Sequence, residues 1–73
     1  MSTKVEHILV DSSMVDTVSY YNNSKKLIVN FKNGRVYLYD NVDEGTFEDV
    51  RKSNSTGRAL HNKVFGVFRY QQL

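Results

Sequence analysis

The stretch that decides the fold is residues 26–39, KLIVNFKNGRVYLY. Its first half alternates, with Leu27, Val29 and Phe31 on one side and more polar positions between them. Such alternation is typical of a half-buried β-strand. Asn33-Gly34 comes next, and this dipeptide is a strong signal for a tight β-hairpin turn. The stretch therefore predicts two antiparallel strands joined by a short loop.

The turn at Asn33-Gly34 leaves two registers open, and they place Tyr37 and Tyr39 on different faces. A two-residue type I′ loop puts both tyrosines on the polar face, where they form a basic and aromatic surface for stacking. If Gly34 forms a bulge after a type I turn, the return strand shifts by one residue and both tyrosines join the core. The sequence alone does not choose between these registers.

Further strands are predicted on both sides of this hairpin. Residues 14–21 are rich in valine, threonine and tyrosine, which favour strands, and a polar turn at residues 22–25 follows. Together with the hairpin they predict a three-stranded antiparallel meander. Residues 7–10 either add a short edge strand or remain loose, and residues 67–72 alternate weakly, as a last strand would.

The apolar spacing becomes helical after the meander. Val42 and Phe47 stand where a hydrophobic staple would close the start of a helix capped by Asp43. Acidic residues in its first turns and basic residues in its last turn suit the helix dipole. We therefore predict a short helix at residues 44–52.

A second helix is predicted shortly afterwards, because Ser55 can cap it, it runs to about Lys63, and Gly66 ends it. Strands followed by helices predict an α+β fold: a three- to four-stranded antiparallel meander with two short helices packed on one face. We expect residues 1–9 to be a loose N-terminal segment and residues 10–73 to form a single domain.

Composition narrows the functional classes. The chain has 73 residues, no cysteine, and no apolar run near the ~20 residues of a membrane span. We expect a cytoplasmic protein with no membrane segment, because a lack of cysteine fits a reducing compartment. Residues 1–50 hold all eight acids against five bases, whereas residues 51–73 hold five bases and no acid. This asymmetry favours an anionic partner such as RNA, or else a solvated face that keeps the protein in solution.

An ordered set of residues runs through most of the chain. It consists of Ser12-Ser13-Met14, Val18-Ser19-Tyr20, Leu27-Ile28-Val29-Asn30-Phe31, Gly34, Tyr37-Leu38-Tyr39, Val42, Ser55-Thr56-Gly57 and Val64. From about residue 10 to residue 70 the chain thereby resembles the KTSC domain, a small domain at the C-terminus of some lysyl-tRNA synthetases that also occurs alone in bacterial and phage proteins. The chain departs from that family's pattern at Asp43, His61 and Phe65, where proline, asparagine and arginine are usual. The resemblance implies no enzyme activity and no cofactor, and RNA binding is the function suggested for the family.

Two kinds of residue are candidates for binding RNA or single-stranded nucleic acid. Aromatic rings can stack on bases, basic side chains can contact phosphates, and a helix start offers free backbone N–H groups. The candidates are Tyr37 and Tyr39 for stacking, Arg51, Lys52, Arg58, Lys63 and Arg69 for phosphates, and Ser55 and Gly57 at the second helix start. The structural alternatives are core packing for the tyrosines and ordinary capping for Ser55.

Nothing in the sequence marks a catalytic or metal site. His7 and His61 are far apart in sequence and have no cysteine to join them, and no nucleophile or general base stands out. The sequence therefore predicts a small non-enzymatic binding module, with RNA as the first candidate partner. The alternative is a protein-interaction or accessory module that uses an exposed sheet edge or the helix pair, with no nucleic-acid binding.

Overall fold

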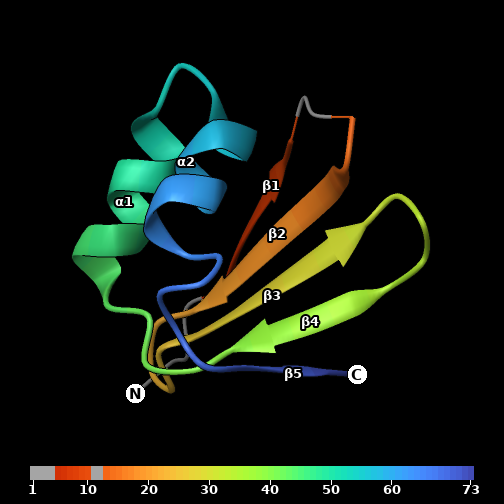
Figure 1. Cartoon of the computed structure of the whole chain (residues 1–73). Coiled ribbons are helices and arrows are strands. Elements are labelled where there is room, and N and C mark those ends of the chain that lie inside the picture. The colour runs from red at the N-terminus through yellow and green to blue at the C-terminus, as the bar shows by residue number, and fades with distance from the viewer. Residues whose placement is uncertain (1–4, 11–12) are drawn as a thin grey trace.

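The computed structural model describes residues 5–10 and 13–73. Its elements are β1 (Val5–Leu9), β2 (Val15–Tyr21), β3 (Lys26–Phe31), β4 (Val36–Tyr39), α1 (Glu44–Lys52), α2 (Thr56–Lys63) and β5 (Tyr70–Gln72). The strands form one sheet in the order β1-β2-β3-β4-β5, and every neighbouring pair is antiparallel. Both helices lie on the same face of this sheet (Figure 1). The predicted α+β fold is thus confirmed, with five strands in the sheet.

The central hairpin has the bulged register. Tyr39 lies opposite Leu27 and Tyr37 lies opposite Val29, so both tyrosines share the face of the apolar β3 side chains. Gly34 has a φ of +91°, the left-handed conformation that closes a bulged turn and that glycine adopts at no steric cost. The shift of one residue moves the tyrosines from the open face to the face that the helices cover.

Both outer strands extend the predicted meander. β1 pairs with β2 along its whole length, from Val5 opposite Tyr21 to Leu9 opposite Thr17. The segment that was expected to be loose therefore contains a strand. Pairing with β1 provides hydrogen-bond partners for the backbone groups at the edge of β2, and Ile8 of β1 packs against the core. Residues 1–4 lie outside the described residues. At the other edge, β5 pairs with β4.

The two helices begin and end where the sequence predicts. Val42 and Phe47, the two residues of the staple at α1, are both completely buried. Asp43 occupies the N-cap position, but its carboxylate accepts a hydrogen bond from the Thr46 hydroxyl and none from a helix N–H. This bond lowers the pKa of Asp43. In α2, the Ser55 hydroxyl accepts the predicted capping hydrogen bond, from the backbone N–H of Arg58 at 3.4 Å.

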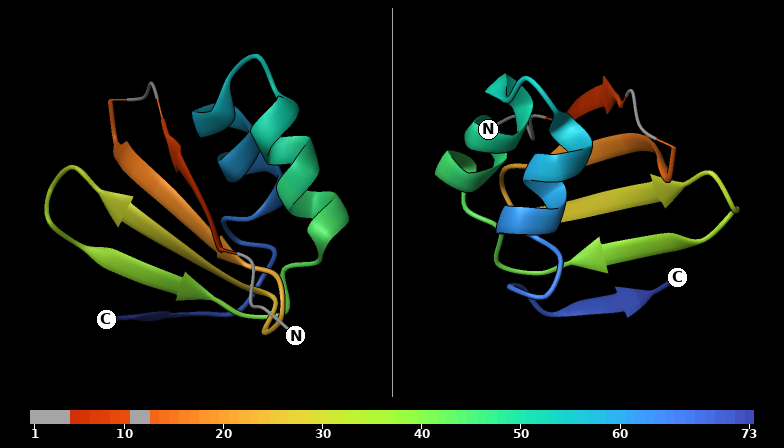
Figure 2. Two further views of the ribbon diagram at one scale, coloured as in Figure 1. Left: turned by 180° about the vertical axis from the view of Figure 1, so that it is seen from behind. Right: turned by 45° about the horizontal axis from the view of Figure 1, so that its top comes forward.

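The core lies between the covered face of the sheet and the two helices. Tyr20 is at its centre, where the ring stacks on Phe47 with centroids 4.4 Å apart and the hydroxyl donates a 2.7 Å hydrogen bond to the Val42 carbonyl. The side chains that make up the core are Val10, Val15, Val18, Tyr20, Leu27, Val29, Tyr39, Val42, Phe47, Val50, Ala59, Leu60 and Val64. Within the described residues, no helix lies on the opposite face of the sheet (Figure 2). In the described part of the chain, no helix is long and apolar enough to cross a membrane.

Candidate functional site

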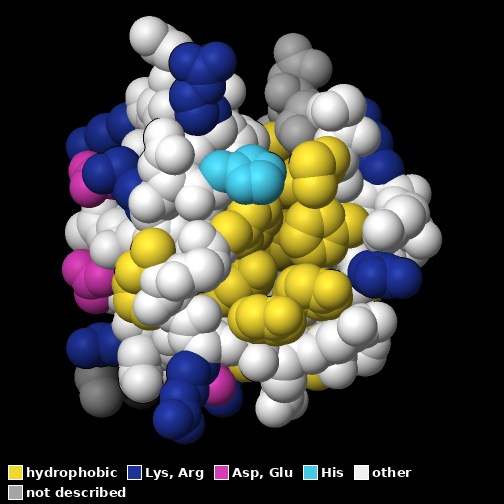
Figure 3. Space-filling view, viewed as in Figure 1, with side chains coloured by type: hydrophobic (Ala, Val, Ile, Leu, Met, Phe, Trp, Pro, Cys, Tyr) yellow, Lys and Arg dark blue, Asp and Glu magenta, His cyan; other side chains and the backbone are white. Residues whose placement is uncertain are grey.

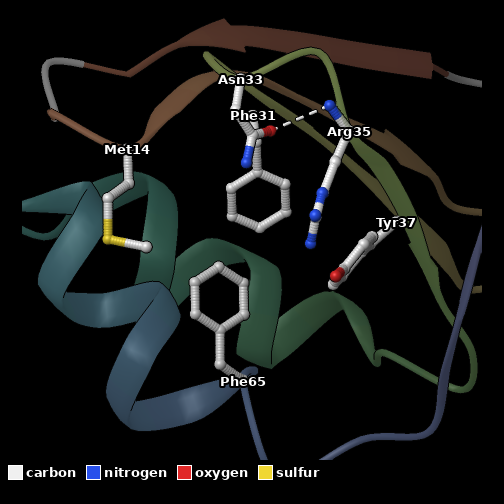
Figure 4. Close-up of a pocket in the computed structure, with 6 residues that line it drawn as sticks. All are labelled: Met14, Phe31, Asn33, Arg35, Tyr37 and Phe65. Carbon is white, nitrogen blue, oxygen red and sulfur yellow. Dashed lines mark hydrogen bonds between the residues drawn. The ribbon is translucent and has the colours of Figure 1, made fainter.

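The helices and the sheet diverge toward the β3–β4 hairpin (Figures 1 and 2). Residues of the hairpin, β4 and the segment after α2 line a hollow in this region. The hollow has a volume of about 270 Å³. We call it the aromatic groove, and its lining residues are Met14, Phe31, Asn33, Arg35, Tyr37 and Phe65 (Figure 4). In the space-filling view, apolar side chains gather in this hollow between the helices and the sheet (Figure 3). The groove is therefore a concave surface with mainly apolar and aromatic side chains in its lining.

Three rings from separate parts of the chain form the walls. Phe31 ends β3, Tyr37 lies in β4, and Phe65 follows α2. The Phe31 centroid is 5.2 Å from that of Tyr37 and 5.8 Å from that of Phe65. All three rings are half-buried, whereas Met14 at the mouth is 51% exposed. The groove thus offers aromatic surface that the protein's own side chains do not fully cover.

A smaller hollow of about 170 Å³ continues the groove along the hairpin. It shares Met14, Phe31 and Asn33 with the main hollow and adds Ser13 and Lys32. The two hollows make one continuous concave surface, with apolar side chains in its middle and polar side chains at the hairpin end.

Arg35 is the charged group of the main hollow. Its backbone is fixed on both sides, because its N–H donates to the Asn33 side-chain oxygen at 2.9 Å and its carbonyl accepts from the Phe31 N–H at 2.9 Å. Its side chain extends along the hollow beside Tyr37 and toward Phe65 (Figure 4). Among the described residues no carboxylate lies within ion-pair distance of Arg35, and no acid lines either hollow.

One face of α2 borders the opposite wall. The His61 ring meets the Phe65 ring edge-on, with centroids 5.0 Å apart. Arg58 lies one helical turn before His61 and therefore on the same side of α2. Both side chains are exposed. Arg58 makes no ion pair with any described residue, so this wall adds a second uncompensated positive charge.

The two predicted stacking residues have different environments. Tyr37 reaches the aromatic groove and stacks on Tyr70 with centroids 5.0 Å apart. Tyr39 is only 3% exposed, between Phe65 at 5.6 Å and Tyr70 at 5.5 Å. Burial raises the pKa of Tyr39 to about 12, and the neighbouring phenols Tyr70 and Tyr37 add to the shift. Tyr39 therefore belongs to the core, and only Tyr37 of this pair offers part of its ring to a ligand.

Three of the five predicted phosphate contacts are paired with acids. Arg51 donates to Glu48 at 2.6 Å and lies 4.0 Å from Glu6, while Lys52 is 3.6 Å from Glu48. The hydrogen bond between Glu48 and Arg51 lowers the pKa of the carboxyl and raises that of the guanidinium. Lys63 is 3.8 Å from Asp49 of α1. Carboxylates from residues 1–50 thus compensate much of the positive charge of residues 51–73.

The remaining candidates do not complete a single basic surface. Arg69 lies opposite Asp40 at one end of β4, whereas Arg35 lies at the other end. In Figure 3 the basic side chains are spread around the rim of the face and do not form one patch. At the start of α2, the Ser55 hydroxyl is engaged by Arg58 and the Ser55 N–H by the Ser53 hydroxyl at 3.1 Å. Gly57 lies in the first turn of α2.

The structure also assigns surface residues that the sequence did not single out. Phe31, Phe65 and Met14 are apolar side chains that the sequence places in the core or leaves without a role. Asn33 and Arg35 signal a turn and a strand, and only the hairpin register shows that they border a hollow. Among the described residues, no group of three or more histidine and acidic side chains is placed to hold a metal ion.

The model of the KTSC domain family matches residues 11–68, which is most of the sequence and includes the groove and both helices. The chain belongs to the KTSC domain family. A crystal structure of a KTSC domain protein from Yersinia pestis is similar in fold, with a TM-score of 0.83 and 22% sequence identity over 96% of this chain and 99% of that one. No curated protein matches the chain.

Two residues that the sequence analysis set apart from the family's pattern lie together beside the groove. The rings of His61 and Phe65 are in contact, and Phe65 lines the hollow. Phe65 therefore supplies part of the aromatic surface of the groove in this chain.

Proposed function

We propose that this KTSC domain is a non-enzymatic protein-interaction module, and that its aromatic groove binds a large apolar side chain of the partner. The observation that carries the proposal is the hollow of about 270 Å³ walled by the half-buried rings of Phe31, Tyr37 and Phe65. Buried aromatic and other large side chains supply most of the energy of protein interfaces, and they do so by filling pockets of the partner.

The size of the groove supports a single side chain as its occupant. Pockets for complete small molecules and cofactors usually measure about 300–1,000 Å³. The hollow of about 270 Å³ lies just below that range and is open to solvent along the hairpin. A ring or a branched aliphatic side chain of a partner protein suits this volume, with the rest of the partner lying across the mouth.

The chemistry of the lining supports binding without catalysis. The six lining residues include no carboxylate, histidine, serine or cysteine, the groups that most often act as nucleophile or general base. His61 borders one wall, but its ring is turned edge-on to Phe65. A role in holding a partner fits these residues better than a role in bond cleavage.

RNA binding is the less supported alternative. Nucleic-acid affinity depends on cations that release the counterions of several phosphates, and Arg51, Lys52 and Lys63 already lie beside carboxylates. Tyr39, one of the two rings expected to stack on bases, is buried in the core. Arg35 and Arg58 still provide positive charge near the groove, so the experiment must include an oligonucleotide.

The proposal is tested by selecting a displayed library of random linear peptides on the immobilised full chain. We expect enrichment of peptides that contain tryptophan, phenylalanine or leucine, and we expect Met14→Ala and Phe65→Ala to weaken their binding. Met14 is 51% exposed, so its truncation leaves the fold intact. Leu9→Ala is the matched control, because Leu9 is 86% exposed and lies on β1, away from the groove.

Two results would contradict the protein-interaction role. Selected peptides that bind the Met14→Ala and Phe65→Ala proteins as tightly as the parent would show that the groove is not their site. The second is a selection that yields no peptide while a single-stranded oligonucleotide shifts the groove amides with a steep salt dependence, at a log–log slope of about −0.7 per phosphate. That result would establish the nucleic-acid alternative.

A further inference from the structure

Resting on the proposed function, we infer that the aromatic groove selects protein segments in which a carboxylate side chain lies next to the apolar side chain, and that Arg35 is the residue that recognises this carboxylate. The partner is thus an acidic segment with an aromatic or large aliphatic residue in it. The inference rests on the position of one uncompensated guanidinium beside three aromatic walls.

Arg35 differs from Arg51 in what surrounds it. The Arg51 guanidinium donates twice to Glu48, at 2.6 and 3.1 Å. The Arg35 guanidinium has no such acceptor among residues 5–10 and 13–73, although its side chain extends along an apolar hollow beside Tyr37 (Figure 4). A guanidinium presents five N–H donors in a planar fork that matches a carboxylate in two parallel hydrogen bonds.

Because Arg35 lines the hollow, its unpaired hydrogen-bond donors make the groove selective for the charge of its ligand. A partner that fills the groove removes water from around the guanidinium, and a buried charge without a counter-ion is strongly unfavourable. An acidic neighbour of the inserted side chain supplies that counter-ion, whereas a basic neighbour adds repulsion. Arg35 therefore favours acidic partners and also excludes basic ones.

Hydrogen bonds fix the backbone of Arg35 beside the groove. Asn33 and Phe31 hold the N–H and the carbonyl of Arg35 at 2.9 Å each, so the residue leaves the hairpin at a fixed point. Lys32 in the adjoining hollow and Arg58 on α2 are also without ion-pair partners in the described part of the chain. Positive charge thus borders the groove on both walls, and no lining residue is acidic.

A protein segment fits these features better than a nucleic-acid strand. Consecutive phosphates require a line of free cations, but the cations of α1 lie beside Glu48 and Arg69 lies at the far end of β4 from Arg35. The three rings pack against one another and line the hollow, where a single side chain can lie against them.

The test uses capped peptides that differ only in charge, with tryptophan between two glutamates, two glutamines or two lysines, and a fourth with alanine between two glutamates. Their dissociation constants are measured by titrating the full chain and following the amide signals of the groove. We expect the glutamate–tryptophan peptide to bind about ten-fold more tightly than the glutamine one, as a charge-assisted hydrogen bond predicts. The lysine and alanine peptides should bind most weakly.

The variants Arg35→Gln and Arg69→Gln remove the same charge at opposite ends of β4. We expect Arg35→Gln to abolish the preference for glutamate, so that this variant binds the glutamate–tryptophan and glutamine–tryptophan peptides equally tightly, while Arg69→Gln keeps the preference. Both arginines are exposed, so neither change affects folding.

The possible failures are distinguishable. If the glutamate and glutamine peptides bind equally tightly, or if the preference survives in Arg35→Gln, the selectivity is overturned and the groove function stands. If no tryptophan peptide shifts the amide signals of the groove, the proposed function is wrong, and so is this inference, which rests on it. If an oligothymidylate displaces the glutamate–tryptophan peptide at lower concentration, the anionic partner is a nucleic acid and the inference is overturned.

Discussion

Two of the aromatic contacts that join the sheet to the segments covering it differ in their exposure to solvent. Tyr20 of β2 and Phe47 of α1 stack at 4.4 Å and are 2% and 0% exposed. Phe31 of β3 and Phe65 after α2 are 5.8 Å apart and both half-buried. The residue types are alike, but one contact is closed to solvent and the other lines an open groove.

The difference comes from what covers each contact. Around Tyr20, the chain that leads into α1 passes over the ring, and the Val42 carbonyl accepts the Tyr20 hydroxyl. Around Phe31, the hairpin extends beyond the helices, and Gly66, with a φ of +77°, turns the chain toward β5. The closed contact stabilises the fold, whereas the open contact leaves apolar surface exposed to solvent.

The largest expected effect is on the closed contact. We expect Phe47→Ala to lower the free energy of unfolding by about 3–5 kcal/mol, which is most of what a domain of this size has. Denaturant titration followed by circular dichroism measures the loss. Phe65→Ala, at the open contact, should cost clearly less because its ring is half-buried in the parent protein. Equal losses for both variants would contradict the contrast between the two contacts.

A finer change tests the hydrogen bond that closes the first contact. We expect Tyr20→Phe to lower the free energy of unfolding by about 1–3 kcal/mol, because the buried Val42 carbonyl loses its donor while the ring stack remains. Tyr37→Phe is the matched control, since no hydrogen bond of the Tyr37 hydroxyl is found among the described residues, and it should change stability by less than about 0.5 kcal/mol. The same loss in both variants would show that the hydroxyl bond does not contribute.

The pH dependence of the free energy of unfolding reports on Tyr39, whose ring packs against Phe65 behind the groove. Burial raises the pKa of Tyr39 from 10.0 to about 12, so the folded protein holds this phenol neutral where the unfolded chain ionises it. This stability is fully present below pH 10 and is lost as the pH rises toward 12. Chemical shifts of the ring measure its titration, and Tyr39→Phe should lessen the loss of stability. Ionisation of Tyr39 near the ordinary pKa of 10.0 would contradict its burial.

The smallest effect is expected where charge is already compensated at the surface. Glu48→Gln removes the carboxylate beside Arg51 and Lys52, yet exposed ion pairs contribute little to stability. We expect a smaller change in the denaturation midpoint than Tyr20→Phe produces, measured side by side. The binding of groove peptides should be unaffected, because α1 does not line the groove. A loss as large as that of Tyr20→Phe would show that this pair contributes to the fold.

The helices were predictable because their signals are local. The staple of Val42 and Phe47, the cap at Ser55 and the glycine after α2 act over one or two turns, and the bounds agree with the structure. The pairing of Arg51 with Glu48 spans three residues of one helix, so the sequence already contained it. The pairing of Lys63 with Asp49 joins two helices and required their packing.

The groove was not predictable, because it depends on how distant segments meet. Phe31 and Phe65 are 5.8 Å apart in space but lie on β3 and beyond α2 in the chain. The sequence also did not decide whether β1 is a strand, because this short segment becomes one by pairing with β2. Sequence patterns describe one element at a time, and a surface shared by several elements has no pattern of its own.

By itself the sequence determined the α+β class, both helices and the central hairpin, because propensity, capping and turn chemistry act between near neighbours. The tertiary structure decided the face on which Tyr37 and Tyr39 lie, since a shift of one residue at Gly34 reverses every side chain of β4. It also decided which cations are compensated by acids, and it leaves Arg35 beside the groove without an ion-pair partner among residues 5–10 and 13–73. Those outcomes depend on distances between atoms far apart in the chain.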